Sequence, residues 1–95
     1  MFGQWSTLST NKVYGPAVTD GFVLAITNCT LGASITGFTD GSNPPTTVRA
    51  INSNPGFSPH METLSIMMPV RKGDYWMVLG CGSDETAYWL PLGSN

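Results

Sequence analysis

The segment from Leu64 to Leu79 constrains the fold of this chain more than any other part of the sequence. Apolar residues occupy every second position from Leu64 to Val70, which is the period of a strand that buries one face. Residues 72–74, Lys-Gly-Asp, predict a turn, because glycine tolerates a positive φ and aspartate favours turns. Residues 75–79, Tyr-Trp-Met-Val-Leu, are apolar at every position, so we expect a strand that is covered on both faces.

The outer face of this second strand needs a cover. A chain of 95 residues makes one domain, and a two-layered domain of that size buries only the inner face of each strand. The outer face of residues 75–79 is therefore expected to meet another subunit or a ligand. A long loop of the same chain is the alternative cover.

Another strand is predicted at residues 22–27, after the turn signal Asp20-Gly21. Large apolar side chains alternate there with small ones. We expect the large row to face the core and the small row to face outward, where it lets a neighbouring subunit approach closely. The large row is Phe22, Leu24 and Ile26, and the small row is Val23, Ala25 and Thr27. The predicted oligomer interface comprises Val23, Ala25, Tyr75, Trp76, Met77 and Leu79.

The rest of the chain consists of short apolar runs separated by turn residues. Turn signals recur every ~8 to 12 residues, and no helical period is present. This pattern predicts an all-β fold, a single antiparallel β-sandwich or barrel of seven or eight short strands that spans residues 1–95 as one domain. The remaining strands are expected at 2–8, 12–14, 33–39, 46–51 and 86–90, with long loops at 40–45 and 52–60.

The charge composition excludes two classes of partner. The chain has four lysines and arginines and a net charge of −2, so it cannot assemble the basic patch of a nucleic-acid binder. No apolar run approaches the ~20 residues of a membrane-spanning helix, so no membrane insertion is expected. The segment from Met1 to Trp5 lacks the basic start and apolar stretch of a signal peptide. We therefore expect synthesis in a cytoplasm, or a chain that is a fragment of a longer protein.

The two cysteines, Cys29 and Cys81, each end an apolar run. They allow one bridge between two strands. The favoured interpretation is instead two small buried apolar residues in a reducing compartment, because no secretion signal accompanies them. In either case we expect the domain to fold without a bridge.

Catalytic chemistry has little support in the residues. Nucleophilic catalysis needs a base beside the nucleophile, and the sole histidine, His60, lies in a proline-flanked loop. Most carboxylates lie in turns, where aspartate is expected for backbone reasons. Two isolated cysteines and one histidine fit no zinc-ligand spacing. We therefore expect a protein that is not an enzyme and holds no metal and no cofactor.

Binding is better supported. Three tryptophans and three tyrosines are many for a small sandwich, and such rings either stack on sugars or fill the core and a subunit interface. Loop residues are better candidates than strand aromatics, because function concentrates on loops held by a rigid scaffold. A neutral polar loop fits a neutral polar ligand such as a glycan. The candidate ligand-binding residues are Asp40, Ser42, Asn43, Asn54 and Phe57.

Four segments carry a resemblance to a known family. They are residues 14–23, the Asn-Pro-Pro loop at 43–45, Pro-Val-Arg-Lys-Gly-Asp-Tyr-Trp at 69–76 and Tyr-Trp-Leu-Pro-Leu-Gly at 88–93. Together they resemble the small trimeric head domains at the tips of bacteriophage tail fibres. More distantly, the alternation that leads into the turn at 72–74 is similar to the globular heads of complement and tumour-necrosis-factor proteins, which are trimeric jelly rolls.

The resemblance implies a jelly-roll-like homotrimer in the virion, at the tip of a phage or prophage tail fibre. Such a tip recognises a glycan or protein receptor on the bacterial surface, and its trimer axis is lined by apolar strand residues. The family offers no catalytic residue and no fixed binding residue to carry over. Two alternatives remain: a free-standing small lectin, distinguished by sugar binding outside any virion, and a structural cap or trimerisation module, distinguished by the absence of a ligand pocket on the loops.

Overall fold

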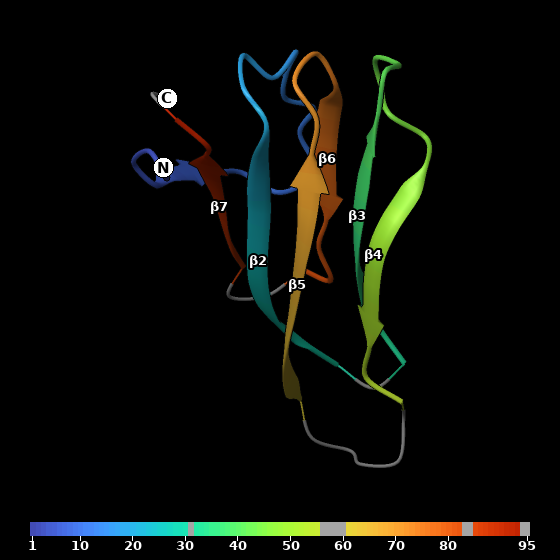
Figure 1. Cartoon of the computed structure of the whole chain (residues 1–95). Helices are drawn as coiled ribbons and strands as arrows, with labels where there is room; N and C mark the ends of the chain where they lie inside the picture. Colours follow the sequence, from blue (N-terminus) through green and yellow to red (C-terminus); the bar gives the residue numbers. More distant parts are fainter. Residues whose placement is uncertain (31, 56–60, 83–84, 94–95) are drawn as a thin grey trace.

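The computed structural model describes residues 1–30, 32–55, 61–82 and 85–93, and these form two antiparallel sheets that pack face to face (Figure 1). The prediction of an all-β sandwich is confirmed, and no helix occurs among the described residues. One sheet has the strand order β1-β7-β2-β5 and the other has the order β4-β3-β6. The strands are β1 (Ser6–Leu8), β2 (Gly21–Cys29), β3 (Ser34–Asp40), β4 (Val48–Ser53), β5 (Glu62–Val70), β6 (Tyr75–Leu79) and β7 (Thr86–Pro91).

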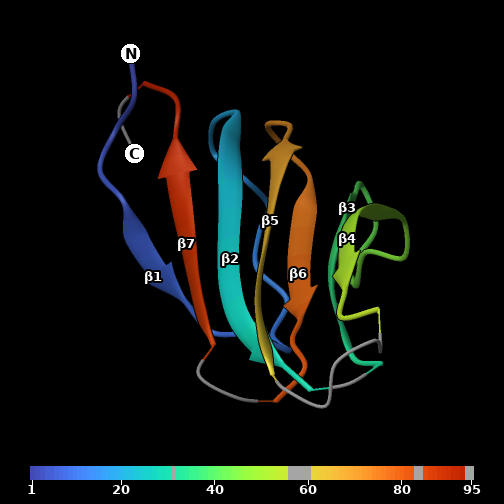
Figure 2. The same cartoon turned by 90° about the horizontal axis from the view of Figure 1, so that it is seen from below.

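The segment from Leu64 to Leu79 joins the two sheets. Strand β5 buries alternate residues from Leu64 to Val70, as its period predicted. The turn that follows has Gly73 at a φ of +89°, and it carries the chain from β5 in one sheet to β6 in the other (Figure 2). The described residues include no helix that could span a membrane.

The predicted short strand at 12–14 does not form a strand. The segment instead pairs with the outer edge of β6 through an isolated bridge. Tyr14 exchanges two backbone hydrogen bonds with Trp76 of β6, at 2.8 and 3.0 Å. The backbone N–H of Asn11 donates to the carbonyl of Val78, and that of Ala17 donates to the carbonyl of Asp74. The segment therefore satisfies the outer backbone groups of β6, which would otherwise be an unpaired sheet edge.

The predicted orientation of β2 is wrong. Its small row, Val23, Ala25 and Thr27, faces the core, with exposed fractions of 0%, 0% and 1%, while the large row faces outward. The physical reason is the size of the side chains that come from the other strands. Trp89 lies beside Val23 in the sheet register, and Trp76 reaches the same layer from the opposite sheet, so only small residues on β2 leave room for both indoles.

Strand β6 alternates as expected, but Trp76 does not face outward as the predicted interface required. Trp76 is 6% exposed and stacks on Trp89, with ring centroids 4.5 Å apart. Tyr75, Met77 and Leu79 face away from the core, so the outer apolar row exists. Val23, Ala25 and Trp76 are buried within the single chain, and they do not form the outer surface that we predicted for them.

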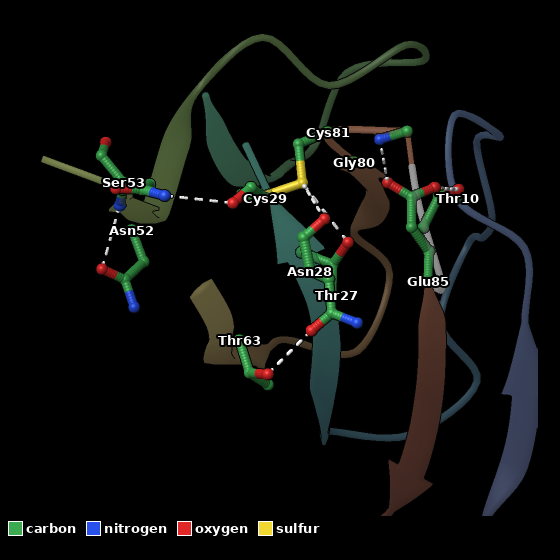
Figure 3. Close-up of a disulfide and its surroundings, with 12 residues drawn as sticks. Thr10, Thr27, Asn28, Cys29, Asn52, Ser53, Thr63, Gly80, Cys81 and Glu85 are labelled. Atoms are coloured by element: carbon green, nitrogen blue, oxygen red, sulfur yellow. Dashed lines mark hydrogen bonds between the residues drawn. A yellow bond between two sulfur atoms is a disulfide. The ribbon is translucent and has the colours of Figure 1, made fainter. Parts of the chain in front are cut away.

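The interpretation of two free cysteines is also wrong. Cys29 ends β2, Cys81 follows β6, and the two form a disulfide with a Cα–Cα distance of 5.6 Å (Figure 3). The bond joins the two sheets at one end of the sandwich, where the antiparallel topology brings these strand ends together. Side chains around it include Thr27, whose Oγ1 lies 3.4 Å from the Cys81 sulfur.

Candidate functional site

The loop from Asp40 to Thr47, here called loop 40–47, is held in shape by one carboxylate. The backbone N–H groups of Ser42, Thr46 and Thr47 donate to Asp40 at 2.8 to 2.9 Å. The hydroxyl of Thr47 donates at 2.8 Å and that of Thr46 at 3.4 Å. These bonds, led by the backbone N–H of Thr46 and then that of Ser42, hold the pKa of the Asp40 carboxyl well below its usual range. Asp40 is therefore ionised and organises the loop.

A hollow of about 400 Å³, here called the polar hollow, lies at the same end of the sandwich as this loop. Figure 1 shows the β3–β4 loop and the β5–β6 turn together at that end. A side chain at Gly41, the first residue after β3, would come within 3.8 Å of Asp74. The loop and the hollow therefore adjoin. The hollow is lined by Thr39, Arg49, Pro69, Arg71 and Asp74.

Both sheets contribute to the polar hollow. Thr39 belongs to β3, and its hydroxyl donates to the carbonyl of Tyr75 at 2.8 Å. Arg49 of β4 donates from Nε to the carbonyl of Thr39 at 3.3 Å. Arg71 follows β5 and donates from Nε to the Asp74 carboxylate at 3.4 Å. The hollow thus presents two guanidinium groups and one carboxylate, which suits binding of a charged or hydroxylated ligand.

A second hollow, here called the aromatic hollow, lies on the outer face of the β1-β7-β2-β5 sheet. Its volume is about 330 Å³ and it is lined by Trp5, Leu24 and Tyr88. The rings of Trp5 and Tyr88 meet edge to face, with centroids 6.0 Å apart. Trp5 is 53% exposed. Exposed ring faces of this kind stack on apolar surfaces, including the faces of sugar rings and other proteins.

The structure brings together three of the five predicted ligand-binding residues. Asp40, Ser42 and Asn43 share loop 40–47 beside the polar hollow, with Ser42 and Asn43 exposed. The carboxylate of Asp40 is already bound within the loop, so it acts as a structural anchor. Asn54 is separated from them, because β3 pairs with β4 so that Asp40 and Asn54 lie toward opposite ends.

The predicted role of Asn54 is corrected by its surroundings. Asn54 is 1% exposed, and its side-chain amide donates to the carbonyl of Cys29 at 3.1 Å. It holds the backbone beside the disulfide and offers no surface to a ligand. Phe57 and His60 lie outside the described residues. Within the described residues, no group of three or more histidine, cysteine, aspartate and glutamate side chains has the geometry to hold a metal ion.

Arg49 and Arg71 were not among the site residues predicted from the sequence. They are the only two arginines of the chain, and each stands next to an apolar strand residue. These two facts were the signal that the sequence offered. The two arginines meet only because the two sheets pack together, and the sequence does not predict which residues that packing brings together. Comparison with known proteins gave no protein family, no curated protein and no solved structure that matches this chain.

Proposed function

We propose that this domain is the non-enzymatic receptor-binding tip of a bacteriophage tail fibre. In this proposal the domain works as a homotrimer and recognises a glycan of the bacterial surface through its loops. The observation that carries the proposal is the junction of loop 40–47 with the polar hollow at one end of a rigid β-sandwich. The assignment to a phage fibre rests on the resemblance described above.

The shape of loop 40–47 favours binding over a merely connecting role. Binding to a flexible loop costs the entropy of ordering it, and a loop that is already held in one shape avoids most of that cost. The five donor bonds to Asp40 fix the loop while Ser42 and Asn43 stay exposed. Their hydroxyl and amide groups both donate and accept hydrogen bonds, as sugar hydroxyls require.

The homotrimer is supported by the outer face of the β4-β3-β6 sheet. Phe38 of β3 lies between Met77 of β6 and Val48 of β4 in the register. Leu79 of β6 is 39% exposed and Ile51 of β4 is 61% exposed, on the two strands that flank β3. An apolar face of this extent is unusual for a monomer that stays in water. Another copy of the chain is the proposed cover, and the preference for three copies comes from the resemblance.

The proposal is tested with an array of purified bacterial lipopolysaccharides and capsular polysaccharides. The domain is expected to be retained on a subset of them. Ser42→Tyr places a ring over the loop and should abolish retention. The matched variant Ser53→Tyr, at the end of β4 that lies farthest from the loop, should not. No retention of the wild-type domain on any polysaccharide, or equal loss in both variants, would contradict glycan recognition through this loop.

A free-standing lectin is the second candidate, and the aromatic hollow is the observation that favours it. In that case sugar rings would stack on Trp5, and a Trp5→Ala variant would lose retention on the same array. In the proposal of a fibre tip, retention of the Trp5→Ala variant is unchanged because the ligand lies at the other site.

A further inference from the structure

We propose that the polar hollow binds one anionic group, a carboxylate or a phosphate carried by the glycan, between Arg49 and Arg71. This inference rests on the proposed function and deepens it, because it names acidic glycans as the ligand class. The sequence alone had favoured a neutral ligand. The arrangement of charges in the hollow changes that expectation.

The two arginines of the chain meet in this one hollow although they come from different sheets. Arg49 lies on β4 and Arg71 directly follows β5. The chain has only four lysines and arginines, so half of its cationic side chains line a single hollow. The protein has a net charge of −2. The two arginines therefore make the electrostatic potential in the hollow more positive than that of the protein as a whole.

Each guanidinium group makes one hydrogen bond through Nε, which leaves its outer edge available; the Arg71 side chain is 81% exposed. Among the described residues, Arg49 hydrogen bonds through Nε to the carbonyl of Thr39, and Arg71 bonds through Nε to Asp74. The terminal Nη groups of both side chains make no hydrogen bond to the described part of the chain. A guanidinium group carries five donors, and its paired N–H groups match the two oxygens of a carboxylate or phosphate.

Two carboxylates lie in or beside the hollow, and only Asp74 belongs to its lining. Asp74 is paired with Arg71 and offsets one of the two charges. Asp40, in the adjoining loop, keeps its negative charge, but its oxygens already accept hydrogen bonds from Ser42, Thr46 and Thr47 and it does not line the hollow. The lining of the hollow therefore carries one positive charge in excess, and Arg49 is the cation that has no carboxylate partner among the described residues.

The size and the remaining lining fit a sugar that carries such a group. A volume of about 400 Å³ falls within the range of about 300 to 1,000 Å³ that is usual for small-ligand sites. Pro69 supplies an apolar wall for the C–H face of a sugar ring. The exposed Ser42 and Asn43 of the adjoining loop offer neutral hydrogen bonds to the next hydroxyls of a glycan chain.

The experiment uses the same polysaccharide array with each sample printed in three forms: native, carboxyl-reduced and dephosphorylated. The wild-type domain is expected to prefer acidic polysaccharides, and one of the two treatments should weaken its apparent affinity by about tenfold or more. Loss on carboxyl reduction identifies a carboxylate, and loss on dephosphorylation identifies a phosphate. Undiminished affinity after both treatments would overturn the inference and leave the proposed glycan recognition standing.

Matched variants separate the hollow from general charge attraction. Arg49→Gln and Arg71→Gln should each lower the affinity for native polysaccharide about tenfold, and each should lower the affinity for the neutralised form by clearly less. Lys72→Gln removes the same charge from the residue next to Arg71 but outside the hollow, and it should have little effect. Arg49→Lys keeps the charge without the paired donors and should weaken binding as well. An equal loss in Lys72→Gln would overturn the inference, and melting curves confirm that each variant is folded.

Discussion

Trp76 of β6 and Trp89 of β7 stack across the two sheets with ring centroids 4.5 Å apart and planes inclined by 16°. Tyr14 lies on the other side of Trp76, at 5.8 Å. The indole Nε1 of Trp76 is buried and has no hydrogen-bond partner among the described residues. The stack fills the space that the small inward side chains of β2 leave, and both indoles belong to the core.

Removing the indole of Trp76 from this stack is expected to destabilise the domain strongly. Trp76→Ala should lower the free energy of unfolding by about 3–5 kcal/mol, measured by urea denaturation. Trp76→Phe should cost clearly less, because it keeps a ring and removes a buried unpaired N–H. As a surface control, Trp5→Ala should cost about 1 kcal/mol or less. Equal losses at positions 76 and 5 would contradict the placement of Trp76 in the core.

Removal of the disulfide is expected to weaken the domain without unfolding it. The bond joins residues 52 positions apart, and closing a loop of that length contributes about 4 kcal/mol when the stabilisation is purely chain entropy. The double variant Cys29→Ala/Cys81→Ala should therefore have a lower midpoint of urea denaturation than the wild type. It should keep the far-ultraviolet circular dichroism of a β protein.

The matched control is the wild-type domain treated with dithiothreitol, which should reproduce the lowered midpoint. If neither treatment changes the midpoint, the bond does not stabilise the domain as chain entropy predicts. If the double variant loses its β signature under mild conditions, the sheets depend on the bond to fold, contrary to our expectation.

Acid is expected to destabilise loop 40–47 through Asp40. Its pKa is lowered in the folded state by donors from Thr46, Ser42 and Thr47, so the folded form releases this proton more readily than the unfolded form. The contribution to stability is complete above the unfolded pKa of ~3.9 and is lost as the pH falls below it. Asp40→Asn should lower the melting temperature at pH 7 and flatten its decline in acid.

The control for this pH dependence is Asp20→Asn, which removes a carboxylate that accepts a hydrogen bond from the backbone of Lys72. It should leave the acid decline caused by Asp40 in place. An Asp40→Asn variant whose melting temperature follows the wild-type curve at every pH would show that the loop does not depend on this carboxylate.

The strands could be predicted from the sequence because period-two patterns depend only on neighbouring residues. From Leu64 to Val70 the alternation also gave the buried row correctly. At 22–27 it gave the strand but not its orientation, because both rows are apolar and the choice depends on two indoles that arrive from β6 and β7. The disulfide was missed for a related reason: the meeting of the ends of β2 and β6 is a property of the topology.

The candidate site was predictable only in part. Paired prolines and the polar residues around them identified the loop that contains Ser42 and Asn43. The polar hollow depends on Arg49 and Arg71, which reach it from different sheets. Asn54 looked like a second loop residue in the sequence, but its amide is used to hold the backbone at Cys29.

A charge on the outer face of β6 is expected to separate the subunits of the proposed homotrimer. Leu79→Lys places an ammonium group in the apolar row formed with Tyr75 and Met77, and burying it without a partner is costly. Sedimentation velocity should show a smaller species for this variant. Ser42→Lys, at the opposite end and outside the row, should sediment like the wild type. An assembled Leu79→Lys variant would place the interface elsewhere.

The mass of the wild-type domain in solution tests the central claim of a homotrimeric fibre tip most directly. Sedimentation equilibrium at several concentrations should give three times the chain mass of 10.2 kDa. A single species at 10.2 kDa at every concentration would contradict the homotrimer.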